Sequence, residues 1–178
     1  MMLEIFVPDL YIRDYRDLNL EELKGKGIKA LVIDIDNTLV PFDVAAPDAD
    51  AAAFLQAVLD SGIKPVIISN NHELRVRSFA EGVGADYVFD AGKPGIGGYT
   101  KAMLATGSVP ETTMMVGDQL FTDIWGANRS GVYSVLVKQI GPDPYFHIRL
   151  KRIAEAVVKP FYRLYSRRHS EDKYLILS

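Results

Sequence analysis

The sequence has no cysteine among its 178 residues. This absence excludes disulfides, zinc–thiolate sites and cysteine nucleophiles, and it fits a reducing cytosol. Histidine is scarce as well: the three histidines show no spacing typical of metal ligands, and we assign them no chemistry. Any metal site in this chain is therefore expected to use oxygen ligands.

Long hydrophobic runs are also missing. No stretch approaches the roughly 18 uninterrupted apolar residues of a membrane span. Residues 1–9 hold acids and a proline where a secretory signal peptide needs a basic start and an apolar run. We therefore expect a cytoplasmic protein. Hydrophobic residues make up 48% and charged residues 24% of the chain, which is ordinary for a folded domain, and the length suits one α/β domain.

The net charge of −3 is unevenly distributed along the chain. Residues 145–169 contain seven lysines and arginines and one acid, so this segment has a net charge of +6 and the remainder has −9. The split indicates that the basic segment contacts something acidic, either a partner surface or the body of the same protein.

Short apolar runs alternate with longer segments of helical composition along the chain. The runs predict buried strands, at residues 30–35, 65–69, 86–89, 113–116 and 132–137. The segments between them predict helices that end near glycines, at residues 48–60, 72–82, 96–106 and 121–130. Asn71 is placed to cap the second of these helices.

This alternation with short links predicts a doubly wound, Rossmann-like α/β fold. We expect a three-layer sandwich with a central parallel sheet of about five strands. Residues 1–140 are expected to form this core together with an N-terminal extension. Residues 141–178 are expected to form a separate basic amphipathic helical tail.

Polar side chains follow four of the predicted strands directly. In a parallel sheet the carboxyl ends of the strands meet at one edge, where ligands bind. We therefore expect these side chains to form one site, built from Asp34, Asp36, Thr38, Ser69, Asn70, Lys93, Asp118 and Asp123. Carboxylates that share a site repel one another unless a cation lies among them. An all-oxygen ligand set favours Mg²⁺, held by Asp34, Asp36, Asp118 and Asp123.

A lysine and a hydroxyl beside such a metal indicate a phosphorylated substrate, because phosphoryl transfer depends on positive charge and fixed donors. Ser69, Asn70 and Lys93 are the expected phosphate ligands. Asp34 is placed to attack phosphorus and form an acyl-phosphate. Asp36 is placed to protonate the leaving oxygen and then to activate water.

The same residues resemble the four motifs of the haloacid-dehalogenase (HAD) superfamily, in family order. The stretch from Asp34 to Thr38 reads DIDNT and resembles the DxDxT first motif; Ser69, Lys93 and the Gly117-Asp118 pair with Asp123 resemble the other three. The resemblance implies a phosphatase with Asp34 as nucleophile and metal ligand, and Asp36 as general acid/base that offers its backbone carbonyl to the metal. It also implies that Thr38 orients the loop, and that Asp123 ligates through water or supports Lys93.

Each of these residues also has a purely structural interpretation. The two aspartates of the first motif could cap a turn, and Ser69 with its two following asparagines could cap a helix. Lys93 could be a surface lysine, and Asp123 could complement a helix dipole. The occurrence of all four motifs in register favours the catalytic interpretation.

Only 30 residues separate Thr38 from Ser69, and 23 separate Ser69 from Lys93. Neither gap can hold a sizeable cap domain, so the chain resembles the capless subclass IIIA of the superfamily. The run FVPDLY at residues 6–11, DIDNTLVPFD at 34–43 and SNN at 69–71 narrow the resemblance to YqeG-like bacterial phosphatases. That group is similar to enzymes that dephosphorylate phosphatidylglycerophosphate, so the resemblance implies a lipid phosphate as the leading substrate.

The tail gives this interpretation modest support. Apolar residues recur at three- and four-residue spacing, at Phe146, Leu150, Ile153, Val157, Phe161 and Leu164. A basic amphipathic helix of this kind can lie on an anionic membrane surface. Peripheral contact with the inner face of the membrane is therefore one interpretation of the tail, whereas a terminal amphipathic helix more often packs on its own domain or on a second subunit.

Three other functions compete with the lipid phosphatase. A signalling receiver domain also phosphorylates an aspartate at a sheet edge, but the spacing of Asp34 and Asp36 fits it less well. A non-catalytic RNA or ribosome adaptor would use the basic tail, yet the complete acidic set argues against it and no nucleic-acid partner is expected. A phosphatase for soluble nucleotides or sugar phosphates would keep the same site. The sequence leaves the oligomeric state open.

Overall fold

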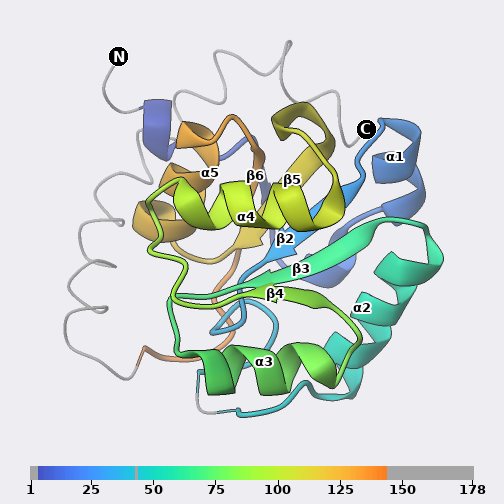
Figure 1. The fold of residues 1–178 in the computed structure, drawn as a ribbon, viewed down its shortest axis with the longest axis vertical. Helices are drawn as coiled ribbons and strands as arrows, with labels where there is room; N and C mark the ends of the chain where they lie inside the picture. Colours follow the sequence, from blue (N-terminus) through green and yellow to red (C-terminus); the bar gives the residue numbers. More distant parts are fainter. Residues whose placement is uncertain (1–3, 43, 144–178) are drawn as a thin grey trace.

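The computed structural model describes residues 4–42 and 44–143, which form a parallel sheet of six strands with helices on both faces (Figure 1). The strand order is β1-β6-β5-β2-β3-β4, and every neighbouring pair is parallel. The strands are β1 (Leu10–Ile12), β2 (Ala30–Ile33), β3 (Lys64–Ile68), β4 (Asp86–Val88), β5 (Thr113–Gly117) and β6 (Tyr133–Val137). The expected Rossmann-like fold is confirmed.

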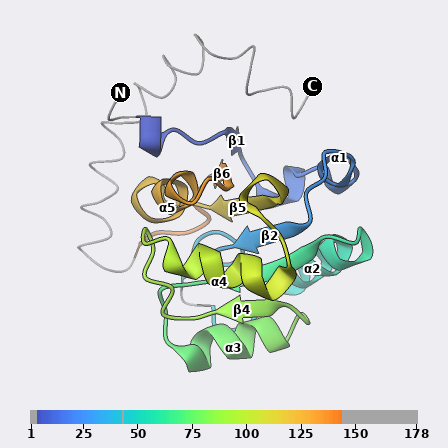
Figure 2. The ribbon, with the colours of Figure 1, turned by 45° about the horizontal axis from the view of Figure 1, so that its top comes forward.

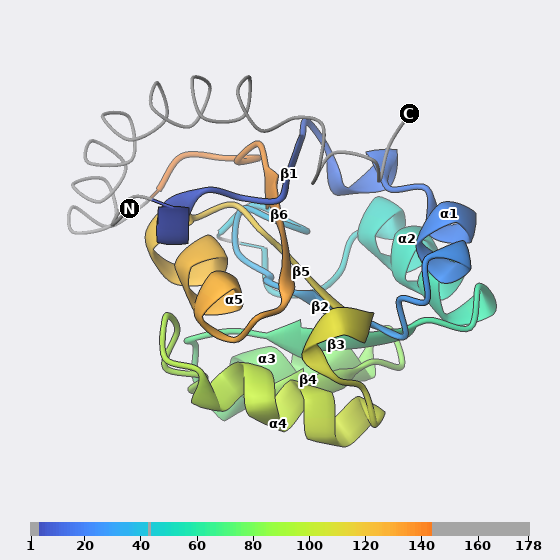
Figure 3. The ribbon, with the colours of Figure 1, turned by 90° about the horizontal axis from the view of Figure 1, so that it is seen from above.

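In the part of the chain that the structure describes, five α-helices connect the strands. They are α1 (Leu20–Gly25), α2 (Ala49–Asp60), α3 (Glu73–Glu81), α4 (Gly97–Thr106) and α5 (Trp125–Arg129). Figure 3 shows α5 on one side of the strands and α1 and α2 on the other. Figure 2 shows α3 beside β4, at the far edge of the sheet from β1. The described residues also include three short 3-10 segments, η1 (Glu4–Phe6), η2 (Tyr15–Asp17) and η3 (Pro110–Thr112).

The central strand β2 shows why the chain folds this way. All four of its residues are fully buried, and successive side chains of a strand point to opposite faces. Leu31 and Ile33 join the core under α1, α2 and α3, whereas Val32 joins the core under α4 and α5. An unbroken apolar run is therefore needed, because both faces are covered.

The sixth strand comes from the N-terminal extension. β1 pairs with β6, and the Asp9 carboxylate, just before β1, accepts hydrogen bonds from the backbone nitrogen (2.9 Å) and hydroxyl (3.1 Å) of Ser134. The asparagine of α5, Asn128, donates to the backbone oxygens of Ile5 and Val7. Side-chain bonds thus fix a strand of only three residues, which is too short for an apolar pattern to reveal.

Two predicted helices differ in detail. The helix predicted over residues 121–130 begins as a π-helical segment, η4 (Leu120–Ile124), before α5; π-helical turns are rare and often occur at functional sites. The helix after β3 begins with His72 as its N-cap, without a side-chain cap bond. The prediction that Asn71 caps it was wrong, because the Asn71 amide donates to Asp36 instead.

Within residues 4–42 and 44–143, no additional domain lies over the sheet. The segment between Thr38 and Ser69 holds a loop, α2 and β3, and the segment between Ser69 and Lys93 holds α3 and β4. None of the helices in this described part is long and apolar enough to cross a membrane. The predicted amphipathic stripe begins at Phe146 and so lies outside the described residues, and the division into a core and a tail stays a prediction.

Candidate active site

The loop after β2 makes a tight turn that presents two acids at the carboxyl edge of the sheet. The Asp34 amide still donates to the carbonyl of Val116 on β5 (3.0 Å), so this acid continues the strand. Asn37 adopts a left-handed conformation with φ of 61°, which asparagine tolerates better than most residues. Its side chain and backbone also bind the segment at Ile140 to Asp143, and these bonds fix the loop.

A buried ion-pair cluster lies at the centre of this edge. The Lys93 ammonium donates to a carboxylate oxygen of Asp34 (2.6 Å) and to one of Asp123 (2.7 Å). The side chains of the three residues are 3%, 8% and 1% exposed, respectively. Asp118 is buried beside them. Residues from the ends of β2 and β5, from the loop after β4 and from η4 therefore meet, as the sequence predicts.

Burial controls the electrostatics of the cluster. Removal from water raises the pKa of the Asp34 carboxyl well above its usual range; Lys93 opposes this shift and the nearby carboxylates add to it. Burial alone would lower the pKa of the Lys93 ammonium, but the attraction of Asp123 and Asp34 outweighs it and raises that pKa. The charged form of Lys93 is thus favoured, and one ammonium cannot offset the charge of three ionised carboxylates.

The donor set fits a divalent cation. Carboxylate oxygens of Asp34, Asp118 and Asp123 all lie within 4.8 Å of one another, and when all three are ionised they carry three negative charges against the single positive charge of Lys93. Ligand oxygens about 2.1 Å from Mg²⁺ lie up to about 4.2 Å apart in octahedral geometry. Oxygen-only ligands and an excess of two negative charges both match a hard divalent ion.

Hydrogen bonds from neighbouring groups fix the positions of Asp118 and Asp123. The Thr38 hydroxyl donates to Asp118 (3.3 Å), and the Gln119 amide donates to the second oxygen of Asp123 (3.0 Å). The fully buried Tyr99 hydroxyl donates to the Asp123 backbone oxygen (2.9 Å). The π-helical turn η4 thus places the Asp123 carboxylate next to Lys93, and hydrogen bonds to the side chain and to the backbone oxygen of Asp123 fix its position.

The two other predicted phosphate ligands lie on the loop after β3. The Ser69 hydroxyl is buried and accepts a hydrogen bond from the backbone nitrogen of Asn71 (3.1 Å). The side chain of Asn70 binds the Lys93 backbone on both sides: it donates to the carbonyl (3.0 Å) and accepts from the amide (2.8 Å). In this structure Asn70 therefore joins the β3 loop to the Lys93 loop, and its role as a phosphate ligand stays a prediction.

Two residues to which the sequence analysis gave no role at the site, Asn71 and Arg75, contact Asp36. The Asn71 side chain donates to one of its carboxylate oxygens (2.7 Å), and Arg75 donates to the other (2.9 Å). The Asp36 side chain is 11% exposed and is not part of the three-carboxylate cluster. No local sequence pattern indicates either contact, because Asp36 lies 35 residues before Asn71 and 39 residues before Arg75.

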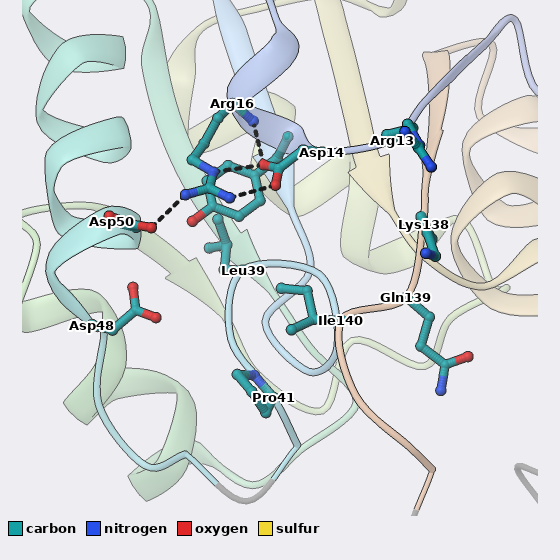
Figure 4. Close-up of a pocket in the computed structure, with 11 residues that line it drawn as sticks. Arg13, Asp14, Arg16, Leu39, Pro41, Asp48, Asp50, Lys138, Gln139 and Ile140 are labelled. Atoms are coloured by element: carbon teal, nitrogen blue, oxygen red, sulfur yellow. Dashed lines mark hydrogen bonds and ion pairs between the residues drawn. The ribbon is translucent and has the colours of Figure 1, made fainter.

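A hollow of about 350 Å³ opens beside Asp118. It is lined by Tyr11, Asp118, Val137, Lys138, Gln139, Ile140, Gly141 and Pro142. A second hollow of about 360 Å³ shares Lys138, Gln139 and Ile140 with it and extends past Arg13 (Figure 4). In Figure 4 the Arg16 guanidinium is paired with Asp14 and Asp50, so its charge is largely neutralised. The N-terminal extension and the end of β6 thus form one side of the site.

Comparison with known proteins places this site in a family. Residues 90–141 match the HAD-hydrolase-like family model. The chain is 32% identical to the probable phosphatase YqeG of Bacillus subtilis over 155 residues, which cover 87% of this chain and 90% of that protein. It is 27% identical to phosphatidylglycerophosphate phosphatase 1, chloroplastic/mitochondrial, of Arabidopsis thaliana, over 90% of this chain and 49% of that one. It is 28% identical to phosphatidylglycerophosphate phosphatase 1, chloroplastic, of Chlamydomonas reinhardtii, over 84% of this chain and 60% of that one.

Solved structures agree on the fold. The cobalt-bound deoxy-D-mannose-octulosonate 8-phosphate phosphatase of Haemophilus influenzae superposes with a TM-score of 0.54 at 13% identity, over 65% of this chain and 70% of that one. NagD from E. coli K-12 gives a TM-score of 0.53 at 16% identity, over 66% and 93%. From its likeness to YqeG across most of both proteins and from the acidic cluster, this chain belongs to the HAD-like hydrolases, in the family of the probable phosphatase YqeG, and is a HAD-type phosphatase.

Proposed function

We propose that this phosphatase uses Mg²⁺ and a phosphoaspartate on Asp34, and that its substrate is phosphatidylglycerophosphate. The chemistry is supported above all by the buried cluster in which Asp34 and Asp123 share the ammonium of Lys93 and Asp118 lies beside these two acids. The substrate is supported by the likeness to two phosphatidylglycerophosphate phosphatases.

In the first step a carboxylate oxygen of Asp34 attacks phosphorus. A bond forms between this oxygen and phosphorus while the bond from phosphorus to the substrate alcohol breaks. The protonated Asp36 carboxyl gives its proton to the departing oxygen, so the alcohol leaves neutral. Ser69 and the amides at the start of α3 donate to phosphate oxygens, and the Lys93 ammonium opposes their negative charge.

The second step releases the phosphate and restores the enzyme. Asp36, now ionised, takes a proton from a water molecule as the water oxygen attacks phosphorus. The bond between phosphorus and the Asp34 oxygen breaks, inorganic phosphate leaves, and both aspartates return to their starting states. The same carboxyl group thus acts first as acid and then as base, and it can do both from one position, because the departing alcohol and the attacking water lie on the same side of phosphorus, opposite Asp34.

Asp34, Asp118 and Asp123 would hold the Mg²⁺ ion through their side chains, and Asp36 would add its backbone carbonyl. When bound, the ion supplies positive charge to the phosphate oxygens and offsets the repulsion among the acids. Thr38 contributes by fixing the orientation of Asp118 through its hydroxyl.

The open surroundings of the site suit a large leaving group. The hollow beside Asp118 joins a cation, Lys138, to the exposed apolar side chains of Tyr11 and Ile140, which are 46% and 47% exposed. A lipid phosphate presents both an anionic headgroup and apolar chains. Contact of the basic tail with an anionic membrane would bring the enzyme to a surface that holds such a substrate.

The decisive experiment measures phosphate release from phosphatidylglycerophosphate in mixed micelles with Mg²⁺. A generic aryl phosphate and a panel of soluble nucleotide and sugar phosphates are measured beside it. We expect strong preference for the lipid, loss of turnover on addition of EDTA, and recovery with Mg²⁺. Activity that persists without metal would refute the metal site.

Asp34→Asn serves as the test of the nucleophile, and Asp60→Asn is its matched control because Asp60 is exposed on α2. The first variant should lose turnover while its circular dichroism spectrum stays unchanged, and the second should keep full activity. Undiminished hydrolysis by Asp34→Asn would remove the phosphoaspartate from the mechanism. Activity on soluble phosphates alone would keep that mechanism and make the soluble-phosphate alternative the function.

A further inference from the structure

The Asp36 carboxylate is held by two donors from the same segment of the chain. Asn71, in the loop after β3, donates to one carboxylate oxygen at 2.7 Å. Arg75, in the first turns of α3, donates to the other at 2.9 Å and forms an ion pair with it. Both donors belong to the α/β domain itself, and each bond joins residues more than thirty positions apart in the sequence.

Such a clamp matters because an aspartate side chain rotates freely about two bonds. A general acid must be held within about 0.5 Å and 10–20° of its productive position. In the described part of this chain, residues 4–42 and 44–143, no cap domain lies over the site to restrict Asp36. Donors to both oxygens fix both torsions, so Asn71 and Arg75 provide the order that a cap would otherwise supply.

The hydrogen bonding of Arg75 is also unusual. Its Nη1 atom is buried and is the one such side-chain nitrogen or oxygen in the described residues without a hydrogen-bond partner. A buried donor without a partner costs free energy, and in a native protein it calls for an explanation. Arg77, on the same helix, differs from Arg75 because its ion pair with Glu81 at 2.8 Å is exposed to solvent.

We propose that Arg75, together with Asn71, is a positioning residue for Asp36 and sets the efficiency of the proton transfer to the leaving group. The inference rests on the proposed function, in which Asp36 is the general acid. Its consequence depends on the substrate: an alkoxide leaves poorly without a proton, whereas a nitrophenolate leaves readily without one. Loss of the clamp should therefore slow alkyl phosphates much more than nitrophenyl phosphate.

The test compares kcat/KM for p-nitrophenyl phosphate and for an alkyl phosphate that the wild-type enzyme hydrolyses. This ratio reports the steps up to the departure of the leaving group, before water attacks the phosphoaspartate. We expect Arg75→Ala to lower kcat/KM about 100-fold for the alkyl phosphate and less than about 5-fold for the aryl phosphate, since general acid catalysis contributes about 10²–10⁴-fold. Arg75→Lys should recover part of the loss, and Arg77→Ala should match the wild type on both substrates.

Asp36→Asn, measured on the same two substrates, distinguishes a failure of the proposed mechanism from a failure of the positioning role of Arg75. If it shows no leaving-group dependence, Asp36 is not the acid and the proposed mechanism fails. If it shows the dependence but Arg75→Ala slows both substrates equally, slows neither, or increases activity, the positioning role is overturned. The double variant should be no worse than Asp36→Asn alone, because Arg75 acts through Asp36.

Discussion

Gly117 is where the structure leaves least room for a side chain beside the proposed catalytic residues. An ideal Cβ at this position would lie 2.5 Å from the Cβ, Cγ and Oδ2 atoms of Asp123. That is about 0.9 Å short of the 3.4 Å at which ordinary contact begins. Asp123 cannot yield without loss, because it is 1% exposed and is held by Lys93 and by the Gln119 amide. Gly117→Ala should therefore displace the Asp123 carboxylate from the cluster.

The expected effects follow from that displacement. Overpacking of a core typically costs about 1–3 kcal/mol, which corresponds to a melting temperature lower by roughly 2–12 °C at about 2–4 °C per kcal/mol. A misplacement of about 1 Å can lower catalysis about 100-fold, and disturbing a group that orients a metal site costs about 10–100-fold in metal affinity.

The assay combines thermal unfolding with and without Mg²⁺ and phosphate release at increasing Mg²⁺ concentrations. Gly97→Ala is the matched control: Gly97 begins α4, has no atom within 4 Å of its ideal Cβ and has no positive φ. It should be as stable as the wild type or slightly more stable. If Gly117→Ala keeps wild-type activity and the same response to Mg²⁺, the tight approach to Asp123 does not organise the site.

Two further predictions concern the neighbours of Asp123. Lys93→Met removes the ammonium from between Asp34 and Asp123. Breaking a buried pair costs about 3–5 kcal/mol of stability, and the variant should be inactive because the positive charge proposed to face the phosphate is gone. Since the carboxylates then lack their cation, Mg²⁺ should raise the melting temperature of the variant more than that of the wild type. An identical thermal response to Mg²⁺ in both proteins would contradict this. Tyr99→Phe removes the hydroxyl bonded to the Asp123 backbone oxygen, and chemical denaturation should show a loss of about 1 kcal/mol. Its kcat/KM should fall less than about 10-fold, since the carboxylate contacts remain, and a 100-fold fall would show that the hydroxyl has a larger role.

The parts of this protein that the sequence reveals are those governed by short-range pattern. β2 is a run of residues buried on both faces, and the acids after it stand at the end of a strand. Parallel strands that end at one edge bring Asp34, Lys93 and Asp123 together whatever the details of the loops. This is why the central cluster could be expected before any distance was known.

The remaining features depend on contacts between distant segments. β1 has three residues and is held by the bond between Asp9 and Ser134, which are 125 residues apart. The role of Asn71 was mistaken because asparagine before a helix usually caps it, whereas here its side chain serves Asp36, 35 residues earlier. Arg75 carries no local sign of its ion pair. A single sequence gives no measure of such long-range pairings.

The burial of the acids links the fold to the proposed requirement for metal. Without a cation, burial raises the pKa of Asp34 and the neighbouring carboxylates add to this shift, so the neutral form of this acid is favoured more than in other aspartates. A protonated carboxyl group is a poor nucleophile. A divalent cation among Asp34, Asp118 and Asp123 favours the ionised form and lowers that pKa. The same ion that offsets the repulsion among the acids would therefore also activate the nucleophile, and both effects arise because the sheet and its loops bury these carboxylates.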